Sequence, residues 1–233
     1  MSWAAYRDCA LIWIRAGQCP RLLPPRRLLW PAAIALAVLA ALTVAVLAGL
    51  TLGRDSAIEL DVHANASGGL TAVMTGLTVL GYSPVLALIV AVAGWGLLRA
   101  VRRLEAVALA AIMVGEGALD DLLKLGVHRA RPQLFVHAAA SGWSFPSGHA
   151  FSTFCLLGTL LYLVWAYTSP LVRFVLVLVA MLLVFGIGLS RVYLGVHFPS
   201  DVVGGWLAGF AWLSAAFAGF RRIVLRWNPA AGT

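Results

Sequence analysis

The chain has 233 residues, of which 62% are hydrophobic and only 11% are charged. Soluble globular domains are about half apolar and about a quarter charged, so this composition excludes a soluble domain and indicates an integral membrane protein. The net charge of +8 does not indicate a nucleic-acid partner, because the basic residues are scattered among apolar segments instead of forming a patch with interleaved aromatic side chains.

The predicted elements begin with a basic leader, residues 1–28, which we expect to lie in the cytoplasm. A transmembrane helix needs about 20 apolar residues, and 29–52 is the first predicted span. The polar segment 53–69 must leave the membrane core, and 70–81 predicts an interfacial helix because Thr and Gly interrupt its apolar run. A basic tail, 221–233, ends the chain, and the other predicted spans are 83–98, 104–125, 148–167, 171–189 and 202–220.

The fold class predicted from this pattern is an all-α polytopic membrane protein with six transmembrane helices in one bundle, residues 29–220. With both termini in the cytoplasm, twelve of the 17 basic residues fall on the cytoplasmic side, as the positive-inside rule requires. The other five are Arg54, Lys124, Arg129, Arg131 and Arg191. For Arg54 and Arg129, reaching out to the lipid headgroups is an alternative to a functional role.

Three polar motifs lie at the outer ends of predicted spans three to six. They are KLGVHRARP at 124–132, PSGH at 146–149 and SRVYLGVHFPSD at 190–201. A six-span bundle would gather their cations, two histidines, a serine and an aspartate in one place. The three cysteines, two near the N-terminus and Cys155 within a span, predict neither a disulfide framework nor a zinc site.

The residue types of these motifs suit a phosphoryl group. Lys124, Arg131 and Arg191 supply positive charge and several donors for an oxyanion. Ser147 and Gly148 precede a predicted helix start, where free backbone N–H groups and the helix dipole favour an anion. Glycine at 148 also lets the backbone approach closely.

The histidines suit the chemistry of phosphoryl transfer. His197 and Asp201 are four residues apart and would face the same way on a helical turn, so the carboxylate could orient the imidazole as a nucleophile. His149 is then left as proton donor to a leaving oxygen. By contrast, His63 and His137 are interpreted as satisfied residues near span ends.

The motifs resemble the signature of the type-2 phosphatidic acid phosphatase family, which shares its site with vanadium haloperoxidases and glucose-6-phosphatase. The family pattern is Lys-x6-Arg-Pro, Pro-Ser-Gly-His and Ser-Arg-x5-His-x3-Asp, and every fixed position is matched in order. The resemblance implies that His197 forms a phosphohistidine, that Asp201 is its partner and that His149 protonates the leaving group. It also implies that neither a metal nor another cofactor is used.

The resemblance further assigns a set of phosphate ligands, namely Lys124, Arg131, Ser147, the Gly148 amide and Arg191. Ser190 either supports this cage or packs between helices. On predicted span three, Glu116, Asp120 and Lys124 are spaced four apart and share one stripe. Asp120 either merely neutralises Lys124 or holds its ammonium toward the phosphate, with Glu116 behind it.

We therefore expect a lipid phosphatase of the cell membrane, with an extracytoplasmic site for a phosphomonoester or diphosphate such as polyprenyl diphosphate, phosphatidylglycerol phosphate or phosphatidic acid. The resemblance implies a bacterial enzyme. One alternative is a lipid phosphotransferase that uses the same site with a lipid or sugar hydroxyl as acceptor. An anion transporter is disfavoured because neither inverted repeats nor broken helices are visible in the sequence. The oligomeric state stays open.

Overall fold

The computed structural model describes residues 25–133, 135 and 141–227. Within these residues it contains helices and no β-strand, which confirms the predicted all-α class. The helices are α2 (Pro25–Leu47), α3 (Leu52–Ala64), α4 (Gly68–Leu80), α5 (Ser83–Arg99), α6 (Arg103–Val127), α7 (Gly148–Trp165), α8 (Pro170–Tyr193) and α9 (Pro199–Trp227). Most of the predicted leader and part of the tail lie outside the described residues, as does His137.

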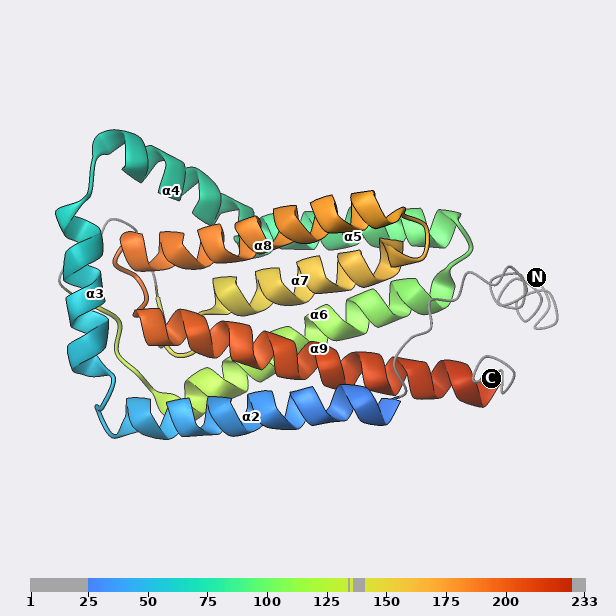
Figure 1. Cartoon of the computed structure of the whole chain (residues 1–233), viewed down its shortest axis with the longest axis horizontal. Coiled ribbons are helices and arrows are strands. Elements are labelled where there is room, and N and C mark those ends of the chain that lie inside the picture. Colours follow the sequence, from blue (N-terminus) through green and yellow to red (C-terminus); the bar gives the residue numbers. More distant parts are fainter. Residues whose placement is uncertain (1–24, 134, 136–140, 228–233) are drawn as a thin grey trace.

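The long helices run side by side, and α3 lies across one end of them (Figure 1). Among the described residues, four helices are long and apolar enough to cross a membrane: Leu29–Leu47, Gly148–Trp165, Pro170–Tyr193 and Pro199–Ile223. A fifth span results if α4 and α5, which are bent by 48° at a short break, are taken together. The protein is therefore a multi-pass membrane protein, and the count of six spans stays a prediction.

Helix α6 corresponds to the predicted span 104–125, but it is not among the helices that are long and apolar enough to cross a membrane. Its 25 residues extend about 38 Å, more than the hydrocarbon core of about 30 Å, so length does not disqualify it. The helix is excluded by the number of its charged residues, which are Arg103, Glu105, Glu116, Asp120, Asp121 and Lys124. Glu116 and Asp120, in the second half of the helix, are buried, which places this charge inside the protein and away from lipid.

The segment after α2 departs most from the predictions. One interfacial helix was expected at 70–81, but two helices occur, because the polar segment also folds into α3. This polar helix buries Asp55 and Glu59 against the bundle, and its Val62 packs against the core. The bend between α4 and α5 is a broken helix pair of the kind that the sequence analysis did not find.

Predicted helix ends also shift. Helix α2 begins inside the predicted leader, and α8 continues to Tyr193, beyond the expected end at 189. The third motif therefore starts within the last turn of α8, its middle (194–198) forms the connection, and its last three residues begin α9. Helix α6 ends where His128 adopts a left-handed conformation, with φ 51°.

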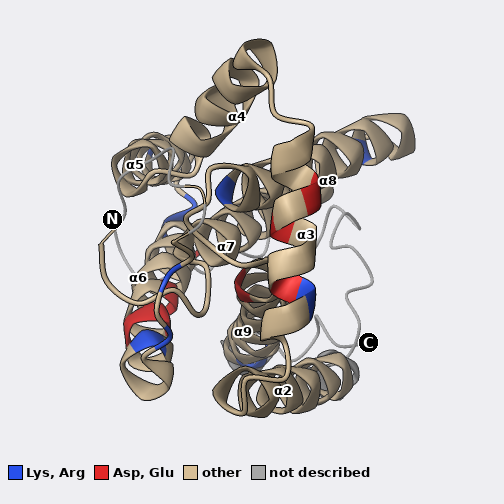
Figure 2. Ribbon diagram, turned by 90° about the vertical axis from the view of Figure 1, so that its left-hand side faces the viewer, with Lys and Arg blue, Asp and Glu red and all other residues tan. Residues whose placement is uncertain are grey.

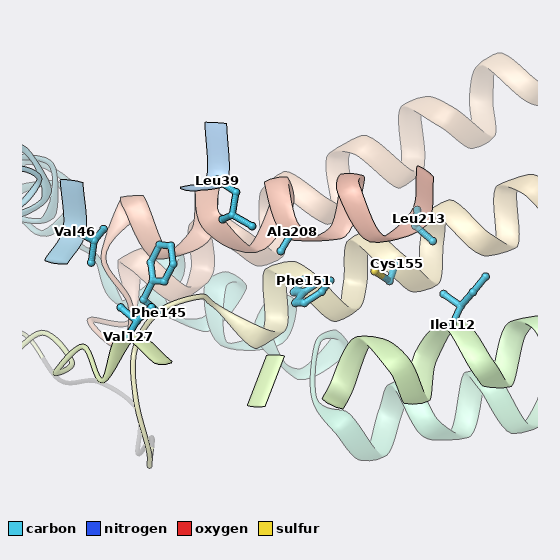
Figure 3. Close-up of a cluster of buried hydrophobic side chains, with 9 residues drawn as sticks. All are labelled: Leu39, Val46, Ile112, Val127, Phe145, Phe151, Cys155, Ala208 and Leu213. Atoms are coloured by element: carbon cyan, nitrogen blue, oxygen red, sulfur yellow. The ribbon is translucent and has the colours of Figure 1, made fainter. Parts of the chain in front are cut away.

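A core of buried apolar side chains joins α2, α6, α7 and α9 (Figure 3). Leu39, Phe151, Cys155 and Ala208 belong to it, so the free thiol of Cys155 packs in the core. Small residues let these helices approach, as is usual between helices in lipid. A Cβ at Gly115 would lie 2.4 Å from the ring of Trp212, so α6 and α9 could not pack as they do with any larger residue there.

Most of the buried charged residues lie at the end of the bundle under α3. Figure 2 looks onto this end and shows acidic and basic positions on α3 and α6 around the ends of the other helices. The three polar motifs reach the same end, since they occupy the last turns of α6 and α8 and the first turns of α7 and α9.

Candidate active site

The three motifs meet through direct contacts. The first and third are joined where Arg131 Nη1 lies 3.0 Å from His197 Nε2. The second and third are joined where the backbone N–H of Ser147 donates to the carbonyl of Asp201 at 2.9 Å. The first and second meet at Gly148, where an added Cβ would lie 3.1 Å from Lys124 Nζ. Three segments that are far apart in the sequence thus form one site.

The hydrogen bonds of His197 define the tautomer of its ring. Arginine is only a donor, so Nε2, which faces Arg131, must be an acceptor with a free lone pair. Nδ1 then carries the proton, and it donates to the carbonyl oxygen of Ser144 at 2.8 Å. Burial lowers the pKa of His197 to about 4, against the opposing effect of nearby Asp201, so the ring is neutral at pH 7. Neutral Nε2 is the form that a nucleophile requires.

Asp201 is not the direct hydrogen-bond partner that its spacing predicted. Its Oδ2 lies 3.6 Å from His197 Nδ1, and it accepts instead from the hydroxyl of Ser144 at 2.5 Å and from the N–H of Phe198 at 2.9 Å. The reason is local: α9 begins only at Pro199, so His197 precedes the helix and the helical spacing rule does not apply. The carboxylate still lies close enough to stabilise positive charge on the ring.

Lys124 has the partner that the stripe on α6 predicted. Its ammonium donates to Asp120 Oδ2 at 2.6 Å, and both residues lie against the start of α7. A Cβ at Gly148 would lie 2.8 Å from that same carboxylate oxygen. Glycine is therefore required for close contact between the ion pair and the helix N-terminus, where free N–H groups favour an anion.

Several buried polar atoms of the motifs have no hydrogen-bond partner among the described residues. They are Ser147 Oγ, His149 Nε2 and Arg191 Nε. Buried polar atoms in proteins are almost always paired, so such a concentration at one end of the bundle identifies groups that a polar substrate could engage. Arg191 is otherwise held by the hydroxyl of Thr78 at 2.6 Å.

Glu116 and Ser190, the other two residues predicted to support the site, form different kinds of contact. Glu116 is buried and accepts from Ser152 on α7 at 2.8 Å, so it ties α6 to α7 one helical turn behind Asp120. The hydroxyl of Ser190 donates to the carbonyl of Ile187 in its own helix at 2.6 Å. This geometry favours the packing interpretation of Ser190 over a place in the phosphate cage.

Two further residues, Ser144 and Arg129, belong to the site and were not predicted from the motifs. Ser144 holds both Asp201 and His197, and its position just before the second motif was the only signal for it. The Arg129 side chain is only 10% exposed and is ion-paired, so the headgroup alternative is wrong for it; its departure from the positive-inside rule was the available signal. His63 is satisfied as expected, since it lies 2.9 Å from the carbonyl of Glu59 and stacks on Phe135. Within the described residues, no group of three or more His, Cys, Asp or Glu could hold a metal ion.

Sequence relatives are lipid phosphatases. Phosphatidylglycerophosphatase B of Bacillus subtilis is 32% identical over 143 residues, which cover 60% of this chain and 70% of the relative. Undecaprenyl-diphosphatase of Sulfolobus acidocaldarius is 36% identical over 41% of this chain and 45% of its own length. Lipid A 1-phosphatase of Rhizobium johnstonii is 36% identical over 44% of this chain and 42% of its own length.

Solved structures agree on the fold. The transmembrane PAP2-type phosphatidylglycerolphosphate phosphatase from Bacillus subtilis superposes with a TM-score of 0.78 and 25% identity, over 83% of this chain and 98% of that one. LpxE of Aquifex aeolicus, at 24% identity, shares the fold with a TM-score of 0.53, over 69% of this chain and 92% of that one. The model of the PAP2 superfamily matches residues 105–224, a segment that contains all three motifs. The resemblance inferred from the motifs is thereby confirmed, and the chain belongs to the PAP2 superfamily.

Proposed function

We propose that this protein, a membrane lipid phosphatase, forms a phosphohistidine on His197 and hydrolyses a terminal phosphate of a membrane lipid at the extracytoplasmic end of its bundle. The observation that carries the proposal is the neutral His197 ring, with its Nε2 lone pair directed at Arg131 where the three motifs meet. The phosphate would bind among Lys124, Arg131 and Arg191 and the N-terminus of α7, where cations and free N–H groups lie together.

The first step is attack of Nε2 on phosphorus. The bond from Nε2 to phosphorus forms while the bond to the leaving oxygen breaks, and that oxygen takes a proton from His149. Arg131 must then exchange its contact with Nε2 for a phosphoryl oxygen. The ring becomes positively charged, and Asp201, 3.6 Å from Nδ1, stabilises that charge.

The second step is hydrolysis of the phosphohistidine. Water attacks phosphorus and gives a proton to His149, while the bond to Nε2 breaks and phosphate leaves. The burial of His149 at the start of α7 leaves its Nε2 without a protein partner among the described residues, which suits an atom that exchanges protons with substrate and water.

The substrate class follows from the site and from the relatives. Their names specify phosphatidylglycerophosphate, undecaprenyl diphosphate and the 1-phosphate of lipid A, which share a terminal phosphate on a lipid. We propose the same class here, with polyprenyl diphosphate, phosphatidylglycerol phosphate and phosphatidic acid as the compounds to test. The residues 29–220 would form the phosphatase domain, with the leader and tail in the cytoplasm.

Phosphate release from this panel in detergent micelles tests the proposal. We expect release without an added acceptor, full activity in excess EDTA and inhibition by vanadate, which mimics pentacoordinate phosphorus. Activity that EDTA abolishes and a divalent ion restores would contradict the metal-free mechanism. Phosphate release only after addition of an alcohol acceptor would identify a phosphotransferase instead.

The sidedness of the site is tested separately. The start of α2 and the end of α9 lie at the end of the bundle opposite α3, which supports a common side for both termini (Figure 1). We expect a reporter fused after Arg226 to be cytoplasmic and one inserted in 135–142 to be extracytoplasmic. The reverse result would place the site in the cytoplasm.

A further inference from the structure

Arg129 lies between the first motif and the nucleophile, and its guanidinium bridges two helices. Nη1 donates to Asp201 Oδ1 at 2.5 Å and to Ser200 Oγ at 2.7 Å. Nη2 donates to Asp55 Oδ2 at 2.7 Å and to Thr51 Oγ1 at 3.3 Å. The arginine side chain is only 10% exposed, so these contacts are formed largely out of water.

One guanidinium thus faces two buried carboxylates, one on α3 and one on α9. Asp55 also accepts from the N–H and the hydroxyl of Ser200, at 3.0 and 2.6 Å, which fixes α3 to the first turn of α9. The planar fork of arginine can bind both carboxylates at once, whereas a lysine ammonium, a compact point charge, has no such fork. The guanidinium also lies 4.3 Å above the ring of Phe198.

The contacts continue from Asp201 to the nucleophile. Asp201 Oδ1 is held by Arg129, and Oδ2 is held by the hydroxyl of Ser144. The carbonyl of that serine accepts the Nδ1 proton of His197. A displaced Asp201 would therefore move Ser144 and, with it, the acceptor that orients the imidazole.

We propose that Arg129, together with Asp55, is a positioning group for the His197 nucleophile, an inference that rests on the phosphatase function proposed above. Each arm of its guanidinium is bound by side chains of the protein. Arg191, in contrast, keeps a buried Nε without a partner among the described residues, as expected of a group that binds phosphate. Arg129 acts through Asp201 and Ser144 without touching the substrate. Helix α3 is thereby a supporting part of the active site.

The test compares the wild type with Arg129→Gln, Arg129→Lys and Asp55→Asn. Arg102→Gln is the matched control, because Arg102 also joins two helices, by donating to the carbonyl of Leu163 on α7, and forms an ion pair with Glu105. It lies at the start of α6, the opposite end from Lys124. We expect Arg129→Gln to lower kcat about 100-fold, the loss that a small misplacement of a reacting group produces, with KM almost unchanged. Arg129→Lys and Asp55→Asn should lose less, and Arg102→Gln should keep its kcat per folded molecule.

Binding of two anions, measured by calorimetry, separates positioning from loss of structure. Vanadate needs a correctly placed His197 Nε2, whereas inorganic phosphate needs only the cations and N–H groups. A positioning defect should weaken vanadate binding at least tenfold and leave phosphate binding unchanged. A merely structural defect lowers the number of binding sites for both anions and changes neither affinity, and that result would overturn the proposal.

The remaining outcomes are also decisive. Wild-type kcat in Arg129→Gln would overturn the inference while leaving the phosphatase function intact. If Arg129→Gln fails to elute as a folded monodisperse protein, Arg129→Lys and Asp55→Asn decide, since both keep side chains of similar size. If the wild type releases no phosphate from any lipid, the proposed function fails, and the ratio of vanadate to phosphate affinity still decides whether Arg129 positions His197.

Discussion

The two ends of the bundle differ in the contacts that join their helices, and α6 contributes to both ends. In its first half, Leu109 is fully buried in a cluster with apolar residues of α5 and α7, namely Leu86, Leu97, Leu156 and Leu163. In its second half, Asp120 and Lys124 form an ion pair against the start of α7. Close apolar packing dominates around the first half of α6, whereas the second half carries a largely buried ion pair.

This difference indicates what each end is for. Ionisable residues within a membrane-spanning bundle are expensive, and they are normally kept for function. Apolar contacts between helices bring stability through packing alone, and many side chains can satisfy them. Substitutions at the apolar end should therefore change stability and spare turnover, whereas substitutions at the charged end should do the reverse.

The largest expected effect is at His197. His197→Ala should lower phosphate release by roughly 10⁴-fold or more, because it removes the nucleophile. His149→Ala should have a comparable effect, and the double variant should be little worse than either, since residues that act as a unit are non-additive. Phosphate release at matched amounts of folded protein is the measurement. Activity close to that of the wild type in either single variant is incompatible with the mechanism.

At the apolar end, Leu109→Ala should cost about 2–5 kcal/mol of stability, because it leaves a cavity in a fully packed cluster. Turnover per folded molecule should not change. Unfolding in detergent measures the first quantity, and phosphate release measures the second. Leu88→Ala on α5 is the matched control, since Leu88 is mostly exposed and its truncation leaves no cavity. A loss of turnover in Leu109→Ala without a loss of stability would contradict the division between the two ends.

Asp120→Asn tests whether Asp120 directs the Lys124 ammonium or merely neutralises it. We expect turnover to fall about tenfold, because the Lys124 ammonium loses the charged partner that directs it toward the phosphate site. Thermal stability in detergent should be nearly unchanged. Asp121→Asn, at an exposed neighbouring position, is the control. Lower stability with normal turnover would show instead that Asp120 merely neutralises the lysine.

The last expected effect is on the dependence of stability on pH. Burial lowers the pKa of His197 from 6.5 to about 4, so below pH 6.5 the unfolded chain binds a proton that the folded protein does not. The free energy of unfolding should therefore fall as pH drops from 6.5 to 4, and this contribution should level off below pH 4. Thermal unfolding of the wild type and of His197→Gln measures it. An identical slope in both proteins would contradict the assignment of the effect to this ring.

Much of the site could be predicted because its parts are local. Lys124, Ser147 and Arg191 lie at helix ends, and the alternation of spans and connections alone brings helix ends together. Asp120 was placed beside Lys124 by the helical period. These inferences needed only the sequence within one helix and the number of spans.

What could not be predicted depends on contacts between distant segments. Arg129 and Asp55 are 74 residues apart, and nothing in either local sequence specifies their pairing. Helix α3 was missed because its polar sequence has no apolar stripe, although Arg129 and Ser200 supply partners for its buried Asp55. The geometry of His197 and Asp201 was wrong in detail, because a helical spacing was applied across a residue that precedes the helix.

The acceptor of the Nδ1 proton of His197 has a consequence for the lifetime of the proposed intermediate. A backbone carbonyl, such as that of Ser144, cannot take a proton away, whereas a carboxylate in the same place could. The phosphorylated ring would therefore remain a cation throughout its existence. A cationic phosphoimidazole departs as a neutral imidazole and is more labile than its neutral counterpart. The same peptide oxygen that prepares the ring for attack would thus also hasten the breakdown of the phosphoenzyme, so that it does not accumulate.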